Sequence, residues 1–186
     1  MHLVRACLNR IFTYIHKKIW ACLSLGKISF GKAGVIGSNT HFTINDNGKI
    51  SVGKNIGIRR GCEFSASENG KISIGDNVFF NNACMVISHD NIIIGDNTKF
   101  GPGVMIFDHD YDFKNENNYR VGKHKSTPII IGENCWIGAG TIILRGTKVG
   151  DNCVVGAGGI LKGVYDDNNL VIQKKEEFLK EIINEG

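Results

Sequence analysis

The residues best suited to chemistry form one polar stretch, Asp108-His109-Asp110, in a chain of 186 residues. An imidazole titrates near neutral pH, so His109 could accept a proton from a weakly acidic group such as a hydroxyl. A carboxylate beside it could orient the ring. Alternation along a loop would direct Asp108 and Asp110 elsewhere, however, and we expect both to be solvated residues at a corner of the chain.

A regular repeat surrounds this stretch on both sides. Apolar residues recur every six positions in six sets of three, and glycine follows the first member of every set. The sets begin at Phe30, Val52, Ile74, Ile94, Ile131 and Val149. This period predicts an all-β protein, a parallel β-helix whose coils stack because one coil cannot bury its apolar edge alone.

Insertions between the sets predict where the chain turns. Short ones fall at the turn-forming strings "NDNG", "SENG" and "SHDN". The one long insertion, residues 108–128, predicts a loop that protrudes beside His109 and could wall an acceptor pocket; a solvent loop without a binding role is the alternative. Its candidates for stacking on sugars or for hydrogen bonding are Tyr111, Phe113, Tyr119, Asn117, Asn118 and Arg120.

The cysteines also follow the repeat. Four of the six lie four residues after a marked apolar position, in a slot that other coils fill with threonine or valine: Cys62, Cys84, Cys135 and Cys153. We expect these four to point inward as small apolar side chains rather than to bind metal or form disulfides. Without a close CxxC pair, a reducing cytoplasm is the default location.

The two ends depart from the repeat, so we divide the chain into residues 1–27, a β-helix domain at 28–165 and a tail at 166–186. An amphipathic helix is predicted near the N-terminus. Its apolar face is expected to comprise Leu8, Phe12, Ile15, Ile19 and Cys22. We expect this face to pack on the β-helix end or on a neighbouring subunit; peripheral contact of residues 1–25 with an anionic membrane is the alternative. The string "KKEEFLKEIINEG" predicts a short C-terminal helix that caps the last coil.

The formal net charge of +4 is unevenly distributed. Six lysine and arginine residues, and no acidic residue, precede Asp46. The basic character thus belongs to the N-terminal segment, and a general nucleic-acid surface is poorly supported. Polar pairs at Asn9-Arg10 and Lys17-Lys18 interrupt the apolar N-terminus, so neither a signal peptide nor a membrane span is expected.

The hexads, the "IGDN" strings, the histidine before the long loop and the later "PIIIGENCWIGAG" together resemble the hexapeptide-repeat acyltransferases. The likeness is strongest to the maltose, galactoside and nodulation O-acetyltransferases and their polysaccharide-modifying relatives, and it covers residues 28–165. It implies a left-handed β-helix of about six coils and a homotrimer with active sites between subunits. It also implies acetyl-CoA as the donor, a hydroxyl or amine of a sugar or glycan precursor as the acceptor, and no metal.

The resemblance also implies roles for single residues. His109 matches the catalytic general base, and Asn81 matches an asparagine near the acceptor, with a turn residue as the alternative. The expected contacts to CoA are Trp136, Ala139, Ala157 and Lys162. The expected contacts to the acceptor are Asp108, Tyr111 and Arg120. Many relatives have a second histidine where Tyr111 stands, and their usual tail is replaced by "NNLVIQKKEEF", which leaves Lys174 and Lys175 as further phosphate candidates.

Three other functions fit the same architecture. Antibiotic and serine acetyltransferases share the core and the donor and differ in the acceptor. A zinc-dependent, carbonic-anhydrase-like protein would need three histidines. His89 and His109 share a register in consecutive coils and His124 could be the third, but the spacing and the Trp-Ile-Gly string favour an acyltransferase. A non-catalytic scaffold is disfavoured by the long polar loop beside a histidine.

Overall fold

The computed structural model of the chain describes residues 2–114 and 122–174, and for residues 2–10 and 12 it describes the backbone alone. Several sequence-based expectations lie outside the described residues. These are the C-terminal helix beyond Lys174, the side chains of Leu8 and Phe12, and Asn117, Asn118, Tyr119, Arg120 and Lys175.

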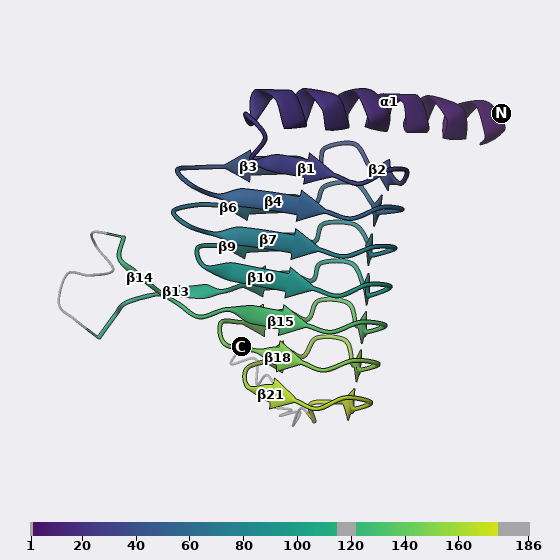
Figure 1. The fold of residues 1–186 in the computed structure, drawn as a ribbon. Helices are drawn as coiled ribbons and strands as arrows, with labels where there is room; N and C mark the ends of the chain where they lie inside the picture. Colours follow the sequence, from purple (N-terminus) through teal and green to yellow (C-terminus); the bar gives the residue numbers. More distant parts are fainter. Residues whose placement is uncertain (1, 115–121, 175–186) are drawn as a thin grey trace, which may run out of the picture.

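Three parallel sheets form the faces of a solenoid (Figure 1). The first sheet contains β1 (Ile28–Phe30), β4 (Lys49–Val52), β7 (Lys71–Ile74), β10 (Asn91–Ile94), β15 (Ile129–Ile131), β18 (Lys148–Val149) and β21 (Val164–Tyr165). The second contains β2 (Val35–Ile36), β5 (Gly57–Ile58), β8 (Phe79–Phe80), β11 (Lys99–Phe100), β16 (Trp136–Ile137), β19 (Val154–Val155) and β22 (Leu170–Val171). The third contains β3 (His41–Ile44), β6 (Glu63–Ala66), β9 (Met85–Ser88), β12 (Met105–Phe107), β17 (Ile142–Leu144) and β20 (Ile160–Leu161). The predicted parallel β-helix is thus confirmed.

The winding of the chain can be followed in Figure 1. Strands of the first sheet run from left to right in front of strands of the third sheet, which run from right to left, and successive coils lie lower. A chain that turns in this sense while it advances downward is left-handed. This is the hand that the resemblance implies, against the usual right-handed rule for parallel crossovers.

The core is a set of ladders in which equivalent side chains of successive coils stack. In the first sheet, Ile50 pairs with Ile72 and Ile72 with Ile92, and all three are buried. The rings of Phe80 and Phe100 stack with centroids 4.5 Å apart. The four cysteines in the small-residue slot are free and buried, as predicted. Burial of apolar area along the whole stack is the main source of stability.

Backbone geometry at one corner explains the glycine that follows the first residue of each set. A Cβ atom on Gly95 would lie 2.6 Å from the carbonyl carbon of Gly132 in the next coil, which is closer than any side chain allows. The same corner holds a column of asparagines at positive φ, a conformation that asparagine tolerates better than most residues. Among them, Asn55, Asn77 and Asn97 form a ladder of side-chain hydrogen bonds.

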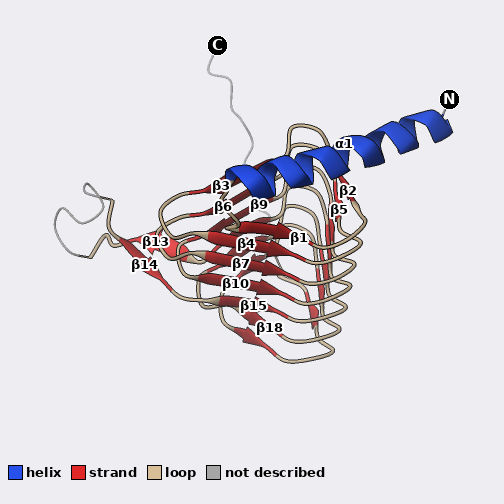
Figure 2. Cartoon of the chain, turned by 45° about the horizontal axis from the view of Figure 1, so that its top comes forward, coloured by secondary structure: helices blue, strands red, loops and turns tan. Residues whose placement is uncertain are grey.

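The predicted N-terminal helix is confirmed as α1 (His2–Leu23), which lies across the first coil (Figure 2). The predicted apolar face, however, does not pack on the β-helix end, and its contact with a neighbouring subunit stays a prediction. Ile15 and Ile19 are exposed, and the contacts come instead from Thr13, whose hydroxyl pairs with the backbone of Ile36, and from Trp20. A hydroxyl can form hydrogen bonds with the unpaired backbone amide and carbonyl groups at the open edge of the first coil, and an aliphatic side chain cannot.

The repeat also continues beyond residue 165, the predicted end of the β-helix domain. Strands β21 and β22 add a further, incomplete coil that ends at Val171. Tyr165 and Val171 are six residues apart, but Tyr165 follows Leu161 by four residues instead of six, and an aspartate stands where the earlier sets have glycine. The pattern was therefore hidden by a shortened spacing as well as by residue type.

The long insertion forms a hairpin at its base. Strand β13 (His109–Tyr111) pairs antiparallel with β14 (His124–Ser126), and the hairpin projects from the solenoid between β12 and β15 (Figure 1). The predicted protruding loop beside His109 is confirmed for the residues that the structure describes.

Candidate active site

His109 is the first residue of the hairpin and lies where the chain leaves the solenoid. It pairs with Ser126 on the returning strand. Its side chain is only 17% exposed, and its Nδ1 lies 3.3 Å from Oδ1 of Asp108. A carboxylate at Nδ1 favours the tautomer in which Nδ1 carries the proton, so Nε2 is the nitrogen that can accept one. The geometry suits His109 for general-base chemistry.

Asp108 is not the solvated corner residue that we expected. It is fully buried and accepts hydrogen bonds from the Ser88 hydroxyl at 2.7 Å and from the amides of His89 and Asp90 at 2.8 and 3.0 Å. The inward and outward alternation of β12 continues one residue past its end, so that Ile106 and Asp108 both face the interior. The carboxylate therefore faces the chain itself and not an acceptor.

The pKa of Asp108 reflects two opposed effects. Burial raises it, but the hydrogen bonds from His109, the His89 amide, the Ser88 hydroxyl and the Asp90 amide outweigh burial, so that the pKa lies below its ordinary value. Asp108 is thus an anion that fixes the orientation of the His109 ring.

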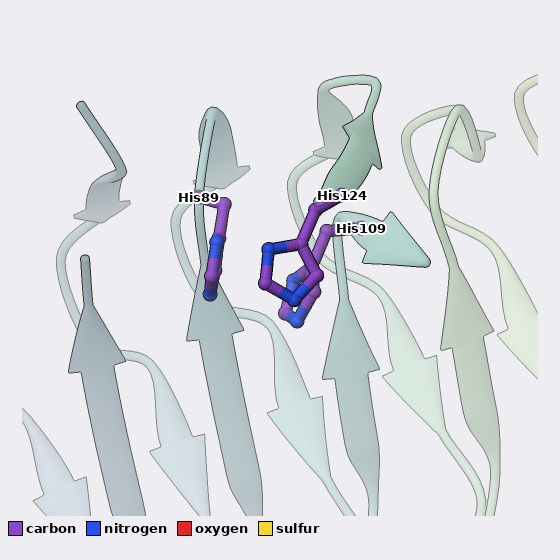
Figure 3. A group of neighbouring side chains, drawn as sticks. All are labelled: His89, His109 and His124. Carbon is purple, nitrogen blue, oxygen red and sulfur yellow. The ribbon is translucent and has the colours of Figure 1, made fainter. Parts of the chain in front are cut away.

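Two further histidines lie against His109 (Figure 3). The ring of His89 stacks on it with centroids 3.9 Å apart, and the ring of His124 approaches both rings edge-on. His89 comes from the corner of the preceding coil, and His124 comes from the returning strand of the hairpin. The structure thus brings together the three histidines that the sequence offered as a zinc set.

Glu68 completes this cluster from one coil further up. Its Oε1 lies 3.2 Å from Nδ1 of His89 and 3.5 Å from Nδ1 of His124. Burial lowers the pKa of His89 and the neighbouring His109 ring lowers it further, whereas the hydrogen bond with Glu68 acts in the opposite direction. The net effect is a pKa of His89 below its ordinary value.

Arg145 anchors the base of the hairpin to the solenoid. Its Nε donates to Oδ2 of Asp110 at 2.7 Å, and its guanidinium also reaches the hydroxyl of Thr127 at 3.4 Å. Asp110 is therefore half-exposed and paired. Arg145 thus contacts residues on both sides of the insertion, Asp110 before the loop and Thr127 after it, and these contacts fix the position of β13 and of His109.

The other predicted site residues lie elsewhere on the chain. Asn81, Ala139 and Ala157 all lie on the corner between the second and third sheets, whereas His109 lies on the corner between the third and the first. Asn81 uses its side-chain oxygen to accept a hydrogen bond from the Asn82 amide, as a turn residue does. Within one chain these residues do not meet His109.

Trp136 and Lys162 are also separated from each other. Trp136 is 60% exposed on the second sheet, which excludes a role in the core. Lys162 is exposed just after β20, on the same corner as His109 but two coils further along. Tyr111 is exposed on the hairpin with its ring 4.7 Å from that of His124, and Phe113 is exposed beyond it.

Sequence reasoning missed the residues that support the histidines. Neither the repeat nor the motifs assigned a role to Glu68, Ser88 or Arg145, although the register offered a signal for two of them. Glu68 and Ser88 lie in the strings "SENG" and "SHDN", which occupy equivalent corners of successive coils. For Arg145, whose partner lies in the insertion, the sequence carries no such signal.

Comparisons with known proteins agree with the fold. Residues 128–162 match the family described as the hexapeptide repeat of succinyl-transferase. Among solved structures, a variant of AntD, an N-acyltransferase from Bacillus cereus in complex with dTDP and coenzyme A, shares 24% identity over 74% of this chain and 75% of its own, with a TM-score of 0.62. A maltose O-acetyltransferase from Clostridium difficile 630 shares 26% identity over 80% of this chain and 71% of its own, with a TM-score of 0.47. Among curated proteins, none matches. The likeness to hexapeptide-repeat proteins is thus confirmed for the repeat and the fold.

Proposed function

We propose that this protein is a CoA-dependent acyltransferase that moves an acetyl group from acetyl-CoA to a hydroxyl or amine of a sugar or glycan precursor. The observation that carries the proposal is the shielded imidazole of His109, held at Nδ1 by a buried carboxylate at the base of a protruding hairpin. The fold of AntD, which was solved with coenzyme A, supports the donor class.

The proposed step needs one proton acceptor. Nε2 of His109 takes the proton from the acceptor hydroxyl while its oxygen forms a bond to the acetyl carbonyl carbon. The resulting tetrahedral oxyanion collapses by breaking the carbon–sulfur bond, and the proton passes to the departing thiolate of CoA. Since the thiolate leaves readily, no protein nucleophile is required.

The placement of the other site residues supports an active site shared between copies of the chain. His109 occupies one corner of the solenoid, and Asn81, Ala139 and Ala157 occupy another. In a ring of three copies, the corner of one chain that carries His109 would lie against the corner of its neighbour that carries Asn81, Ala139 and Ala157. Such a ring is possible because a threefold rotation closes on itself. We therefore propose a homotrimer in which CoA lies along Trp136 and the two alanines of one subunit.

The hairpin supports a carbohydrate acceptor. Tyr111 and Phe113 expose their rings on the hairpin that begins at His109, and aromatic faces of this kind offer apolar contact to sugar rings. A thiol-release screen with acetyl-CoA tests the function against nucleotide sugars, free sugars, serine and aminoglycoside antibiotics. We expect turnover with a sugar. Turnover with serine or an antibiotic would retain the acyltransferase and change the acceptor, and no thiol release with any of them would contradict the proposal.

We further propose that α1 lies on an anionic membrane surface at the cytoplasmic side. It exposes the apolar side chains of Ile11, Tyr14, Ile15 and Ile19. The segment before Asp46 carries only basic charges, which complements anionic lipid. Among the described residues, none forms a helix long and apolar enough to cross a membrane.

Co-sedimentation with vesicles tests this proposal. We expect binding to phosphatidylserine-containing vesicles and little binding to phosphatidylcholine alone. Replacing Ile15 and Ile19 by glutamate should weaken binding about tenfold for each side chain, since each would otherwise bury apolar area in the lipid. Val164→Glu, at an exposed apolar site near the far end of the solenoid, is the control. Unchanged vesicle binding with a loss of oligomers would instead assign the face to a subunit contact.

A further inference from the structure

We propose that His89, His109 and His124 form a binding site for a divalent cation of the zinc class. Each residue has a ring nitrogen that lies within 4.8 Å of those of the other two. Three nitrogens around a tetrahedral zinc with bonds of about 2.1 Å lie about 3.4 Å apart. Small rotations of the rings would close the remaining distance.

The surroundings of the three rings match those of a metal site. Nδ1 of His89 is within hydrogen-bond distance of Glu68, and Nδ1 of His109 is within hydrogen-bond distance of Asp108. Nδ1 of His124 lies 3.5 Å from the same Glu68 oxygen and forms no hydrogen bond with it. Metal-binding histidines commonly donate their second ring N–H to a carboxylate, which fixes the ring and raises the basicity of the other nitrogen. The Nε2 atoms of His89 and His109 are therefore the ones available to coordinate an ion.

Charge and access favour a cation at the same place. Two carboxylates, those of Glu68 and Asp108, lie within 3.5 Å of ring nitrogens of the cluster, and a divalent ion would add compensating positive charge beside them. The side chains of His89, His109 and His124 are 13, 17 and 16% exposed, so the cluster is shielded and still open to solvent. With three protein ligands, a tetrahedral ion would retain one open position for water.

The ligands come from segments that only the fold brings together. His89 follows β9, and His109 and His124 lie on the two strands of the hairpin (Figure 3). An ion would thus tie the hairpin to the preceding coil. It would also occupy Nε2 of His109, so that metal binding and acetyl transfer compete for one atom; this consequence alone rests on the proposed function.

Metal binding can be measured on the full, untagged chain without reference to activity. After dialysis against a chelator, we expect one Zn²⁺ per chain by competition with a chromophoric chelator, and visible absorption typical of tetrahedral Co²⁺ when cobalt is the probe. His124→Ala should weaken binding about 100-fold or more, and Glu68→Gln about tenfold, as loss of an outer carboxylate does elsewhere. His41→Ala, an exposed histidine outside the cluster, should change nothing.

The outcomes separate the two proposals. Equal affinity of the wild type and His124→Ala, or less than one ion per chain at saturation, would overturn the metal site whatever the enzyme does. If the site binds zinc, added zinc should also inhibit acetyl transfer and a chelator should restore it. Transfer that is absent from the metal-free protein would count against the proposed function and leave the metal measurement unaffected.

Discussion

Replacing His109 by alanine should lower kcat for acetyl transfer by about 10²–10⁴-fold, the usual contribution of a positioned general base. The reason is that a hydroxyl acceptor must lose its proton as it attacks the thioester, and the described residues place no other imidazole so directly over a buried carboxylate. His89 and His124 lie nearby, but their Nδ1 atoms face the half-exposed Glu68. The measurement is thiol release under saturating acetyl-CoA.

Two controls make the result specific. His41→Ala removes an exposed imidazole at the start of β3 and should retain wild-type turnover. Circular dichroism and the affinity for CoA should be unchanged in His109→Ala, because the ring is not part of the core. Wild-type turnover in His109→Ala would defeat the assignment of the base.

Replacing Asp108 by asparagine should destabilise the fold by about 3 kcal/mol or more. The carboxylate accepts hydrogen bonds from a hydroxyl, two amides and an imidazole, and it is fully buried. The amide of asparagine has one accepting atom, so in either orientation one backbone amide, that of His89 or that of Asp90, would face its NH₂ group, at about 1–3 kcal/mol, and the remaining hydrogen bonds would lose the charge that strengthens them. Domains of this size have a total stability of about 5–15 kcal/mol, so the loss is large.

Asp110→Asn is the matched control for this change. Asp110 lies two residues away, but its side chain is 41% exposed and pairs with Arg145 near the surface. Pairs of this kind contribute about 0–1 kcal/mol. Urea denaturation should therefore show a large fall in the midpoint for Asp108→Asn and a small one for Asp110→Asn. Equal midpoints would show that the buried network does not stabilise the fold as described.

The solenoid could be predicted from the sequence because its constraint is local and repeated. Every coil repeats the same pattern of three apolar residues six positions apart, with a glycine after the first. A misassigned residue in one coil therefore does not change the period that the other coils define. The end of the repeat was missed at Tyr165, which follows Leu161 by four residues instead of six and precedes an aspartate in place of the usual glycine. The packing face of α1 was missed because it uses Thr13 to pair with an open backbone edge, and hydrophobic periodicity does not register such a contact.

The candidate site could be predicted only in part. The position of His109 beside a protruding insertion followed from the broken period. The role of Asp108 did not, because an irregular loop was expected at residues 108–110, whereas the strand alternation persists and turns the carboxylate inward. His124 lies close to His89 because β14 folds back along β13. This pairing spans an insertion that has no sequence repeat, so the sequence could not predict it.

The stacking of the coils also fixes a height. α1 lies on the first coil and His109 leaves the fourth, three strand spacings below, or about 14 Å. If α1 lies on lipid, the length of the solenoid fixes the distance of Nε2 of His109 from the bilayer. A glycan growing from a lipid carrier would then be modified according to how far it reaches, and one extra coil would raise the point of modification by about 4.8 Å.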